Sequence, residues 1–314
     1  MPTATRFSAS VTTAGLHFRN PIVLASGTAG YGREVHDVLD LSAVGGISTK
    51  AVSVEPRHGA RPLRVAEFAG GMINAVGLAN PGLEVAHAEA IPWIRANHPG
   101  TRVFVNVIGN RVEDFETVVG TFDNSDFVDA FELNVSCPNV KAGGLEFGAD
   151  PVALSQLVSA SRAKTSKPIF VKLSPTLGAA IVDAAHTCVE AGATGLTMVN
   201  TMPGLVIDVE RRAPRIGFGS GGVSGPALLP VGLLAVRRVR QAMPTVPIIG
   251  LGGVSRGVDV VQYLLAGANL VGIGTAALRN PRAPERIVRE FTRWCERHSV
   301  DAPLSLVGKL TWPA

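Results

Sequence analysis

Cysteine is scarce in this 314-residue chain: Cys137, Cys188 and Cys295 are the three present, and they lie far apart. No C-x-x-C pair and no even set of cysteines occurs, so the sequence favours neither a disulfide framework nor a cysteine-ligated cluster. The seven histidines are scattered, without an H-x-x-x-H or H-E-x-x-H pair. A structural or catalytic metal site on this chain is therefore not expected.

Long apolar runs are also missing. No stretch reaches the ~18 residues of a transmembrane helix, and residues 1–15 lack the apolar core of a secretory signal. Aromatic residues make up 5%, and no basic run is interleaved with them, which argues against nucleic-acid binding. The mild net charge of +4 suits a small anionic ligand. We expect a cytoplasmic protein without membrane or nucleic-acid partners.

Apolar residues and glycine are plentiful, at 46% of the chain and 35 residues respectively. This composition supplies a sizeable core and many tight turns. Short apolar runs rich in β-branched residues alternate with longer stretches of helical spacing. Several runs are apolar on both faces, as buried parallel strands are. The eight runs begin at residues 21 (PIVLAS), 45 (GGISTKAV), 102 (RVFVNVIG), 130 (AFELNVSC), 168 (PIFVKLSP), 195 (GLTMVN), 247 (PIIGLGGV) and 270 (LVGIGTAAL).

Four of the intervening stretches read as helices: residues 150–164, 178–192, 255–267 and 283–298. Asp150 followed by Pro151 is typical of a helix start, and Gly192 suits a helix end. Eight strand–helix units in series predict an α/β fold, a single (β/α)8 TIM barrel over residues 1–314. A doubly wound sheet is the alternative, but it seldom needs eight regular units.

Two segments break the alternation. Residues 8–21 read as a hairpin suited to close the barrel floor, and roughly 25 residues rich in Gly, Pro and Arg follow the sixth strand. Long βα-loop insertions lie at the C-terminal face of this fold, where chemistry occurs. Within the insertion, residues 217–222 (GFGSGG) match G-x-G-x-x-G, but they follow no buried strand and open no helix. We interpret them as a flexible loop over the site.

Polar residues follow the ends of six predicted strands. They are Ser26, Lys50, Asn106, Asn134 with Ser136 and Cys137, Lys172, and Asn200 with Thr201. Polar side chains inside an apolar barrel need partners. Each could be satisfied by its neighbours, but their gathering at one end predicts a shared ligand. For Lys50 and Lys172 no acidic residue occupies a matching strand end, so we expect the ligand to supply the anion.

The seventh and eighth strands end in glycine turns, Gly252-Gly253 and Gly274-Thr275. This pair of turns occupies the usual phosphate position of the fold. Each glycine turn alone could be a tight connection and nothing more. Together and in this order they predict a phosphate-bearing ligand.

The segment NVSCPNV places Cys137 at a strand end, directly before a proline. A lone cysteine of this kind is usually a small buried hydrophobe. Here amide side chains flank it, so a structural and a reactive role remain equally open from the residues alone. Cys188 and Cys295 fall on predicted helices and are expected to be structural.

The motifs NAVGLANPG, ELNVSCPNVKAGG, FVKLSP, VNTMPG, GGVSGPALLP, GLGGV and GTAAL occur in this order between residues 16 and 293. Together they resemble the class 1 dihydroorotate dehydrogenases. The cysteine of the S-C-P-N motif resembles the class 1 enzymes, because the membrane-associated class 2 enzymes have serine at that position. NAVGLANPG followed by NVK resembles the B-type of class 1. Met202-Pro203 departs from the aliphatic residues usual in the family, which affects the shape of that loop.

The resemblance implies an FMN enzyme that oxidises (S)-dihydroorotate to orotate in pyrimidine (UMP) biosynthesis. A hydride would pass from C6 to FMN and a proton from C5 to Cys137. The implied FMN residues are Ser26, Lys50, Ala51, Asn106, Asn134, Lys172, Val199, Gly225, Gly252, Gly253, Gly274 and Thr275. The implied substrate residues are Lys50, Asn74, Ala75, Val76, Gly77, Leu78, Asn134, Asn200 and Thr201.

B-type membership further implies a partner subunit that carries FAD and a [2Fe–2S] cluster and passes electrons to NAD. Two catalytic and two transfer subunits would assemble around a homodimer core. Two alternatives stay open. One is an A-type homodimer that reduces fumarate. The other is a non-catalytic flavin-binding barrel, which would need neither Cys137 nor the asparagines at positions 74, 134 and 200.

Overall fold

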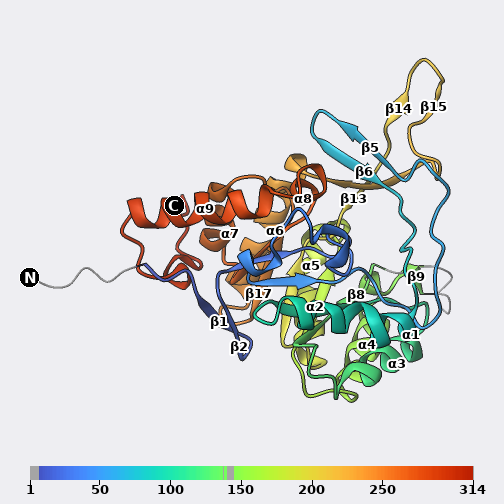
Figure 1. Ribbon diagram of the computed structural model, residues 1–314, viewed down its shortest axis with the longest axis horizontal. Helices are drawn as coiled ribbons and strands as arrows, with labels where there is room; N and C mark the ends of the chain where they lie inside the picture. The colour runs from blue at the N-terminus through green and yellow to red at the C-terminus, as the bar shows by residue number, and fades with distance from the viewer. Residues whose placement is uncertain (1–6, 137, 140–144, 314) are drawn as a thin grey trace, which may run out of the picture.

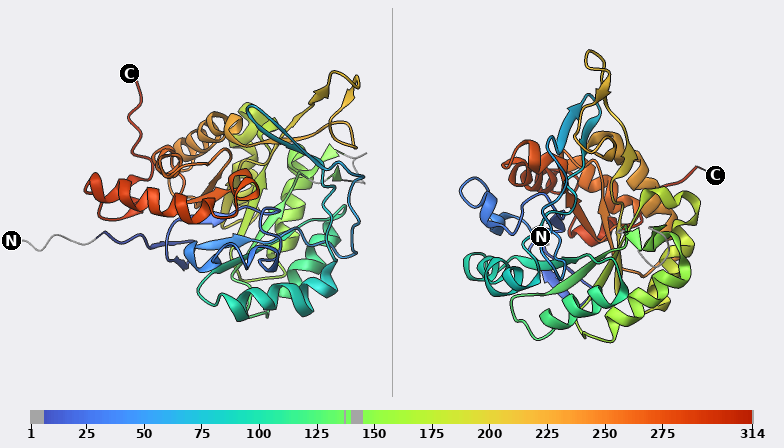
Figure 2. Two further views of the ribbon diagram at one scale, coloured as in Figure 1. Left: turned by 45° about the horizontal axis from the view of Figure 1, so that its top comes forward. Right: turned by 90° about the vertical axis from the view of Figure 1, so that its right-hand side faces the viewer.

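The computed structural model describes residues 7–136, 138–139 and 145–313. Its centre is a closed barrel of parallel strands whose spatial order follows the chain. The strands are β3 (Ile22–Leu24), β4 (Gly46–Ser48), β7 (Arg102–Val107), β8 (Ala130–Asn134), β11 (Ile169–Leu173), β12 (Gly195–Met198), β17 (Ile248–Leu251) and β18 (Leu270–Ile273). Each coincides with a predicted run, and helices surround the strands (Figure 2). The predicted (β/α)8 barrel is confirmed.

The helices follow the strands as α1 (Leu83–Val85), α2 (Ile91–Asn97), α3 (Val112–Phe122), α4 (Pro151–Arg162), α5 (Ile181–Glu190), α6 (Leu229–Ala242), α7 (Gly257–Ala266), α8 (Thr275–Arg279) and α9 (Ala283–Arg297). A π-helical turn, η3 (Ala86–Ala90), joins α1 to α2. Helix α4 begins as predicted: the Asp150 carboxylate accepts hydrogen bonds from the backbone N–H groups of Val152 (2.9 Å) and Ala153 (3.3 Å). Gly192, just after α5, has a φ of +102°.

The predicted helix over residues 178–192 was wrong at its start. Gly178 has a φ of +55° and a ψ of −114°, so the segment Pro175–Ala180 forms the 3-10 element η6 and α5 begins only at Ile181. The first strand–helix unit also departs from the expected regularity. Between β3 and β4 lie only the 3-10 turns η1 (Arg33–Val35) and η2 (Leu41–Ala43). Gly27, Gly30 and Gly32 all have positive φ there, which a helix cannot accommodate.

One end of the barrel is closed by the predicted hairpin, β1 (Val11–Thr13) and β2 (Leu16–Phe18), near the N-terminus (Figure 1). Phe18 stacks on Phe104 with ring centroids 6.1 Å apart, and Phe104 meets Phe170 at 5.5 Å. The apolar cluster inside this end is Val11, Phe18, Val23, Phe104, Ala130, Phe170, Ile249 and Leu270. The barrel floor is therefore a packed core.

The opposite end carries the insertions, which reach out beyond the barrel (Figure 1). A four-stranded sheet of order β13-β16-β6-β5 is built from β5 (Val65–Phe68), β6 (Gly71–Asn74), β13 (Met202–Gly204) and β16 (Gly221–Ser224). The hairpin of β14 (Ile207–Asp208) and β15 (Ala213–Pro214) extends beyond it. The insertion after the sixth strand was predicted, whereas the β5–β6 hairpin was not. Short elements complete the chain: β9 (Pro138–Asn139), β10 (Leu145–Glu146), η5 (Phe147–Ala149), η7 (Pro226–Leu228) and η8 (Pro303–Leu306).

The GFGSGG segment opens no helix, as expected, but it is not wholly a loop. Gly221 and Gly222 belong to β16, and Gly222 lies opposite Asn74 of β6. Glycine is required there because a Cβ on Gly222 would lie 2.1 Å from Oγ1 of Thr201. Across the described ranges, no helix is long and apolar enough to cross a membrane.

Candidate active site

Above the apolar floor, the barrel interior becomes polar. One buried side chain from each of five neighbouring strands forms this layer, which we call the polar belt: Ser48, Asn106, Glu132, Lys172 and Thr197. Strand register sets the positions, since Asn106 lies opposite Glu132 and Lys172 opposite Thr197. Along the barrel axis, the belt lies between the apolar floor and the end that carries the insertions.

Lys172 has an acidic neighbour within a strand rather than at a strand end, so the expectation that a ligand supplies its anion in place of an internal ion pair was wrong. Its Nζ lies 3.7 Å from Oε1 of Glu132, and both side chains are buried. Glu132 was overlooked because it lies inside its strand rather than at the end. No described residue accepts a hydrogen bond from Nζ of Lys172, so its N–H groups remain free to meet a ligand.

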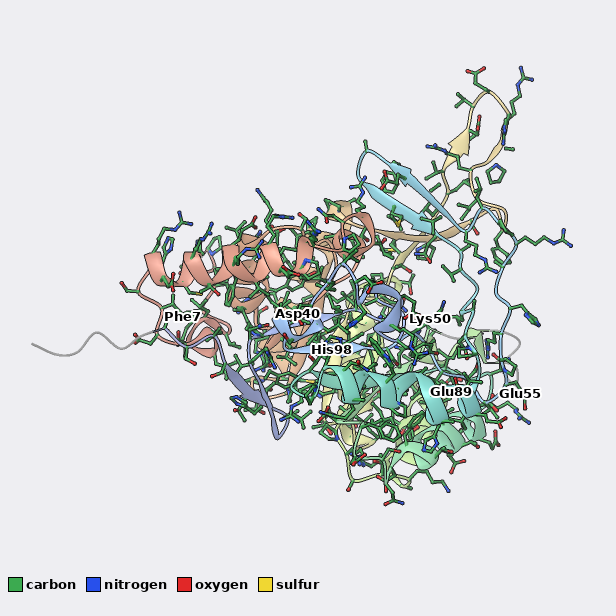
Figure 3. All side chains as sticks on the ribbon, in the orientation of Figure 1. Phe7, Asp40, Lys50, Glu55, Glu89 and His98 are labelled. Carbon is green, nitrogen blue, oxygen red and sulfur yellow. The ribbon has the colours of Figure 1, made fainter. Side chains whose placement is uncertain are left out.

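Lys50, at the end of β4, is half-buried and forms no ion pair with a described residue. It lies well away from Phe7 at the N-terminal end of the barrel (Figure 3). Ala51, directly after it, is buried against Ile108, and Leu78 packs onto this pair. The predicted residues Lys50, Ala51 and Leu78 are thus neighbours at one rim.

Three buried oxygen atoms lack a hydrogen-bond partner among the described residues. Oδ1 of Asn106 and Oγ1 of Thr197 belong to the belt, and Oγ of Ser136 lies just after β8. The amide nitrogen of Asn106 is by contrast well placed, donating to Glu132 Oε1 at 2.7 Å. A buried polar atom without a partner costs about 1–3 kcal/mol. A ligand with a polar edge, such as the isoalloxazine ring of FMN, would satisfy them, so these residues fit a flavin.

The predicted asparagines meet near the ends of β8 and β12. Nδ2 of Asn200 donates to Oδ1 of Asn134 at 3.3 Å, and the backbone N–H of Thr201 donates to Oδ1 of Asn200 at 2.9 Å. Asn74 approaches from β6 and donates to the carbonyl of Gly222 at 3.2 Å. Because Gly222 contacts Thr201, the three asparagines lie along one chain of contacts, which can present neutral donors and acceptors to a planar ring.

The turn after β6 offers backbone donors. Ala75 donates to the carbonyl of Arg64 at 2.8 Å, but no described residue accepts from the N–H groups of Val76, Gly77 or Leu78. Gly77 and Leu78 both have positive φ, at 71° and 56°. Successive free N–H groups on such a turn form a concave anion site, as a carboxylate requires.

A cavity of about 190 Å³ lies at the ends of β17 and β18, where the phosphate is expected, and we call it the phosphate-end cavity. Three predicted FMN residues line it together: Gly253 and Thr275 of the two predicted phosphate turns, and Gly225. A Cβ on Gly225 would approach Cα of Gly71 to 2.8 Å, which explains the glycine. The remaining lining residues are Pro226, Val254, Ser255, Ala276, Arg279, Asn280, Ala283 and Arg286.

Sequence reasoning missed the two arginines at this cavity. Arg279 pairs with Glu67 of β5 (2.7 Å) and Arg286 with Glu290 (2.6 Å). Arg279 lies one helical turn after Thr275, so spacing from the predicted phosphate turn is the signal that could have found it. Because a carboxylate already opposes each charge, the two arginines offer an anion here chiefly their remaining N–H donors.

The other predicted cofactor residues lie at the same rim. Backbone hydrogen bonds join Ala25 to Ile273 (2.9 Å) and Val199 to Leu251 (2.8 Å). These bonds bring Ser26 beside Gly274 and Val199 beside Gly252. Cys137, the predicted base, lies outside the described residues.

The other two cysteines are structural, as predicted. Cys188 and Cys295 are fully buried on α5 and α9. Burial raises the pKa of the Cys188 thiol to about 12. For Cys295, burial and then Glu296 raise the thiol pKa to about 12. Neither thiol is suited to proton transfer near neutral pH.

Residues 8–294 match the family model of dihydroorotate dehydrogenase. This chain belongs to the dihydroorotate dehydrogenase family. It is 43% identical over 302 residues to the dihydroorotate dehydrogenase B (NAD(+)) catalytic subunit of Pelobacter propionicus, covering 96% of this chain and 98% of the relative. The like-named subunit of Cutibacterium acnes is 42% identical over 89% of this chain and 90% of its own length. The resemblance stated from the sequence motifs is confirmed.

Another family member leaves the electron acceptor open. A Solibacter usitatus protein, provisionally named dihydroorotate dehydrogenase A (fumarate), is 42% identical over 96% of this chain and 98% of its own length. Overall identity therefore does not separate the two types here.

Proposed function

We propose that this chain, working as one domain, is an FMN-dependent dehydrogenase that oxidises (S)-dihydroorotate to orotate in pyrimidine biosynthesis. The observation that carries the proposal is the gathering of the polar belt, the asparagines and the phosphate-end cavity at one rim of a family barrel. FMN with a pyrimidine substrate needs all three of these protein features side by side: a phosphate site, a buried lysine and a set of neutral amide side chains.

FMN would be held along this rim. Gly225, Gly253 and Thr275 would take its phosphate, while Lys172 and Asn106 would face the ring. The rest of the proposed set is Ser26, Lys50, Ala51, Asn134, Val199, Gly252 and Gly274. When bound, FMN would supply the redox chemistry by accepting the hydride from C6 of the substrate.

The substrate would lie against the asparagines. Asn74, Asn134 and Asn200 would hold the polar atoms of its ring, and the free N–H groups of residues 76–78 would hold its carboxylate. Lys50, Ala75 and Thr201 complete the proposed contacts. The amides fix orientation without adding charge to the ring.

Cys137 would act as the base. Its thiolate would take the proton from C5 as C6 loses a hydride, leaving the C5–C6 double bond of orotate. A thiolate suits this role when its pKa lies near the working pH.

Replacing Cys137 by Ala tests the base assignment. We expect the variant to keep its yellow flavin while dihydroorotate reduces that flavin about 10²–10⁴-fold more slowly, because base catalysis contributes that much. Stopped-flow absorbance of the flavin band measures both properties. Cys188→Ala, in the core of α5, is the control and should react at the wild-type rate. Unchanged reduction in the Cys137 variant would refute the assignment.

We further propose that the chain is the B-type catalytic subunit. Its partner would carry FAD and a [2Fe–2S] cluster, two of each subunit assembling around a homodimer core. The relatives named as B (NAD(+)) catalytic subunits support this proposal.

Acceptor assays on the isolated chain distinguish the types. We expect dihydroorotate to reduce the bound FMN, while NAD is reduced only after a brown iron–sulfur flavoprotein from the native host is added. Rapid fumarate reduction by the chain alone would instead favour the A-type. Flavin binding without any reduction by dihydroorotate would indicate a non-catalytic barrel.

A further inference from the structure

The carboxylate of Glu132 joins four adjacent strands of the barrel. Its Oε1 accepts hydrogen bonds from Ser48 Oγ of β4 at 2.8 Å and from Asn106 Nδ2 of β7 at 2.7 Å. The same oxygen lies 3.7 Å from Lys172 Nζ of β11. A single oxygen atom thus links Glu132 to three of the other four residues of the polar belt.

Two of these partners are residues proposed to face FMN. The bond from Asn106 Nδ2 fixes the amide so that Oδ1, which has no described partner, is the free end. Lys172 keeps its N–H groups free while its charge is opposed by a nearby carboxylate. In a buried setting such a carboxylate interacts strongly with any charge beyond the lysine, because water does not screen it.

We propose that Glu132 is a positioning residue of the flavin site, which orients Asn106 and Lys172 and offsets the lysine charge, and so limits the preference of the site for reduced FMN. The inference rests on the proposed function. Reduction of FMN adds negative charge, which an uncompensated ammonium would stabilise. Glu132 lowers that stabilisation and would keep the flavin able to pass its electrons on.

A purely structural role makes a different prediction. If Glu132 only links strands, its removal changes stability but not the relative affinity for oxidised and reduced FMN. The hydroxyl of Ser48 donates to the same oxygen without contacting Lys172 or Asn106 in any described bond. Ser48→Ala is therefore the matched control for lost linkage.

The experiment measures the reduction potential of FMN bound to the full-length chain by equilibration with reference dyes. For Glu132→Gln we expect reduced FMN to gain about tenfold in affinity relative to oxidised FMN, which raises the potential by about 30 mV for a two-electron couple. Ser48→Ala should keep the wild-type potential. An unchanged potential in Glu132→Gln, or an equal shift in Ser48→Ala, would overturn the inference.

Glu132→Gln could leave Lys172 buried without a counter-charge and fail to fold. A second pair of variants reduces this problem. In Lys172→Gln the Glu132 carboxylate still accepts hydrogen bonds from Ser48 and Asn106, and the double variant Lys172→Gln/Glu132→Gln buries neither charge. We expect the double variant to have a higher potential than Lys172→Gln alone, and equal potentials would refute the role of Glu132. A wild-type chain that binds no FMN would overturn the proposed function itself.

Discussion

His98 is a buried titratable residue away from the candidate active site. It follows α2, and its Nε2 lies 3.3 Å from Nδ1 of His36, while Nδ1 lies 3.9 Å from Oδ1 of Asp40 (Figure 3). Burial, and next the neighbouring His36, lower the pKa of His98, although Asp40 acts in the opposite direction. The folded protein therefore favours neutral His98, whereas the unfolded chain protonates it near its ordinary pKa of about 6.5.

This shift predicts a pH dependence of stability. Between the lowered pKa and about pH 6.5 the unfolded chain binds more protons, so the free energy of unfolding falls as the pH falls through this window. In His98→Gln the decline should be shallower, by less than the about 1.4 kcal/mol per pH unit that one whole proton gives. Urea unfolding between pH 5 and 7.5 measures the slope. His186→Gln, at an exposed position on α5, is the control and should keep the wild-type slope. A wild-type slope in His98→Gln would contradict the prediction.

Helices α3 and α7 begin with the same kind of N-terminal hydrogen bonding. In each, the aspartate at the third helical position accepts from the backbone before the helix: Asp114 from Asn110 (2.9 Å), and Asp259 from Ser255 and Arg256 (both 2.9 Å). The guanidinium groups of Arg111 and Arg256 also donate to these carboxylates, at 3.1 Å and 3.5 Å. Only the turn before α7 lines the phosphate-end cavity.

Substitution of these two aspartates tests helix stability and ligand binding separately. We expect Asp114→Ala and Asp259→Ala each to lower the free energy of unfolding by about 1 kcal/mol or more, since each removes a cap. Asp259→Ala alone should also weaken FMN binding, by roughly tenfold, because residues 253–255 lose their anchor. Fluorescence titration with FMN gives the affinity. Equal affinities in both variants would show that the cap does not shape the cavity.

At the scale of the whole molecule, stability and chemistry occupy opposite ends of the barrel. The floor is closed by the β1–β2 hairpin, where Phe18 is buried against Phe104. The polar belt, the asparagines and the phosphate-end cavity lie toward the insertions. This division is the usual one in TIM barrels, where strand C-terminal ends carry the chemistry.

A floor substitution should therefore affect folding without affecting the ligand. Phe18→Ala is expected to lower the free energy of unfolding by about 3–5 kcal/mol, as truncation of a buried aromatic ring does. FMN affinity of the folded protein should stay at the wild-type value. Phe218→Ala, at a highly exposed position of the insertion, should change stability by less than about 0.5 kcal/mol. Weaker FMN binding in Phe18→Ala would show that the two ends are coupled.

Features that depend on neighbouring residues could be predicted from the amino-acid sequence. Apolar runs located all eight barrel strands, Asp150 located the start of α4, and residues 8–21 located the hairpin of the floor. Local patterning suffices for these because strand burial, helix capping and tight turns are satisfied within a few residues. The family motifs added an expected set of site residues, and those within the described ranges lie at one rim.

Contacts between side chains far apart in the sequence depend instead on the folded barrel. Lys172 and Glu132 are forty positions apart, and the register of two adjacent strands brings their charges together. Ser48 and Thr197 join the belt for the same reason, since barrel closure selects which face of each strand points inward. The apolar pattern of one strand does not specify its register against a neighbouring strand. Contacts between residues of different strands therefore follow from the folded barrel alone.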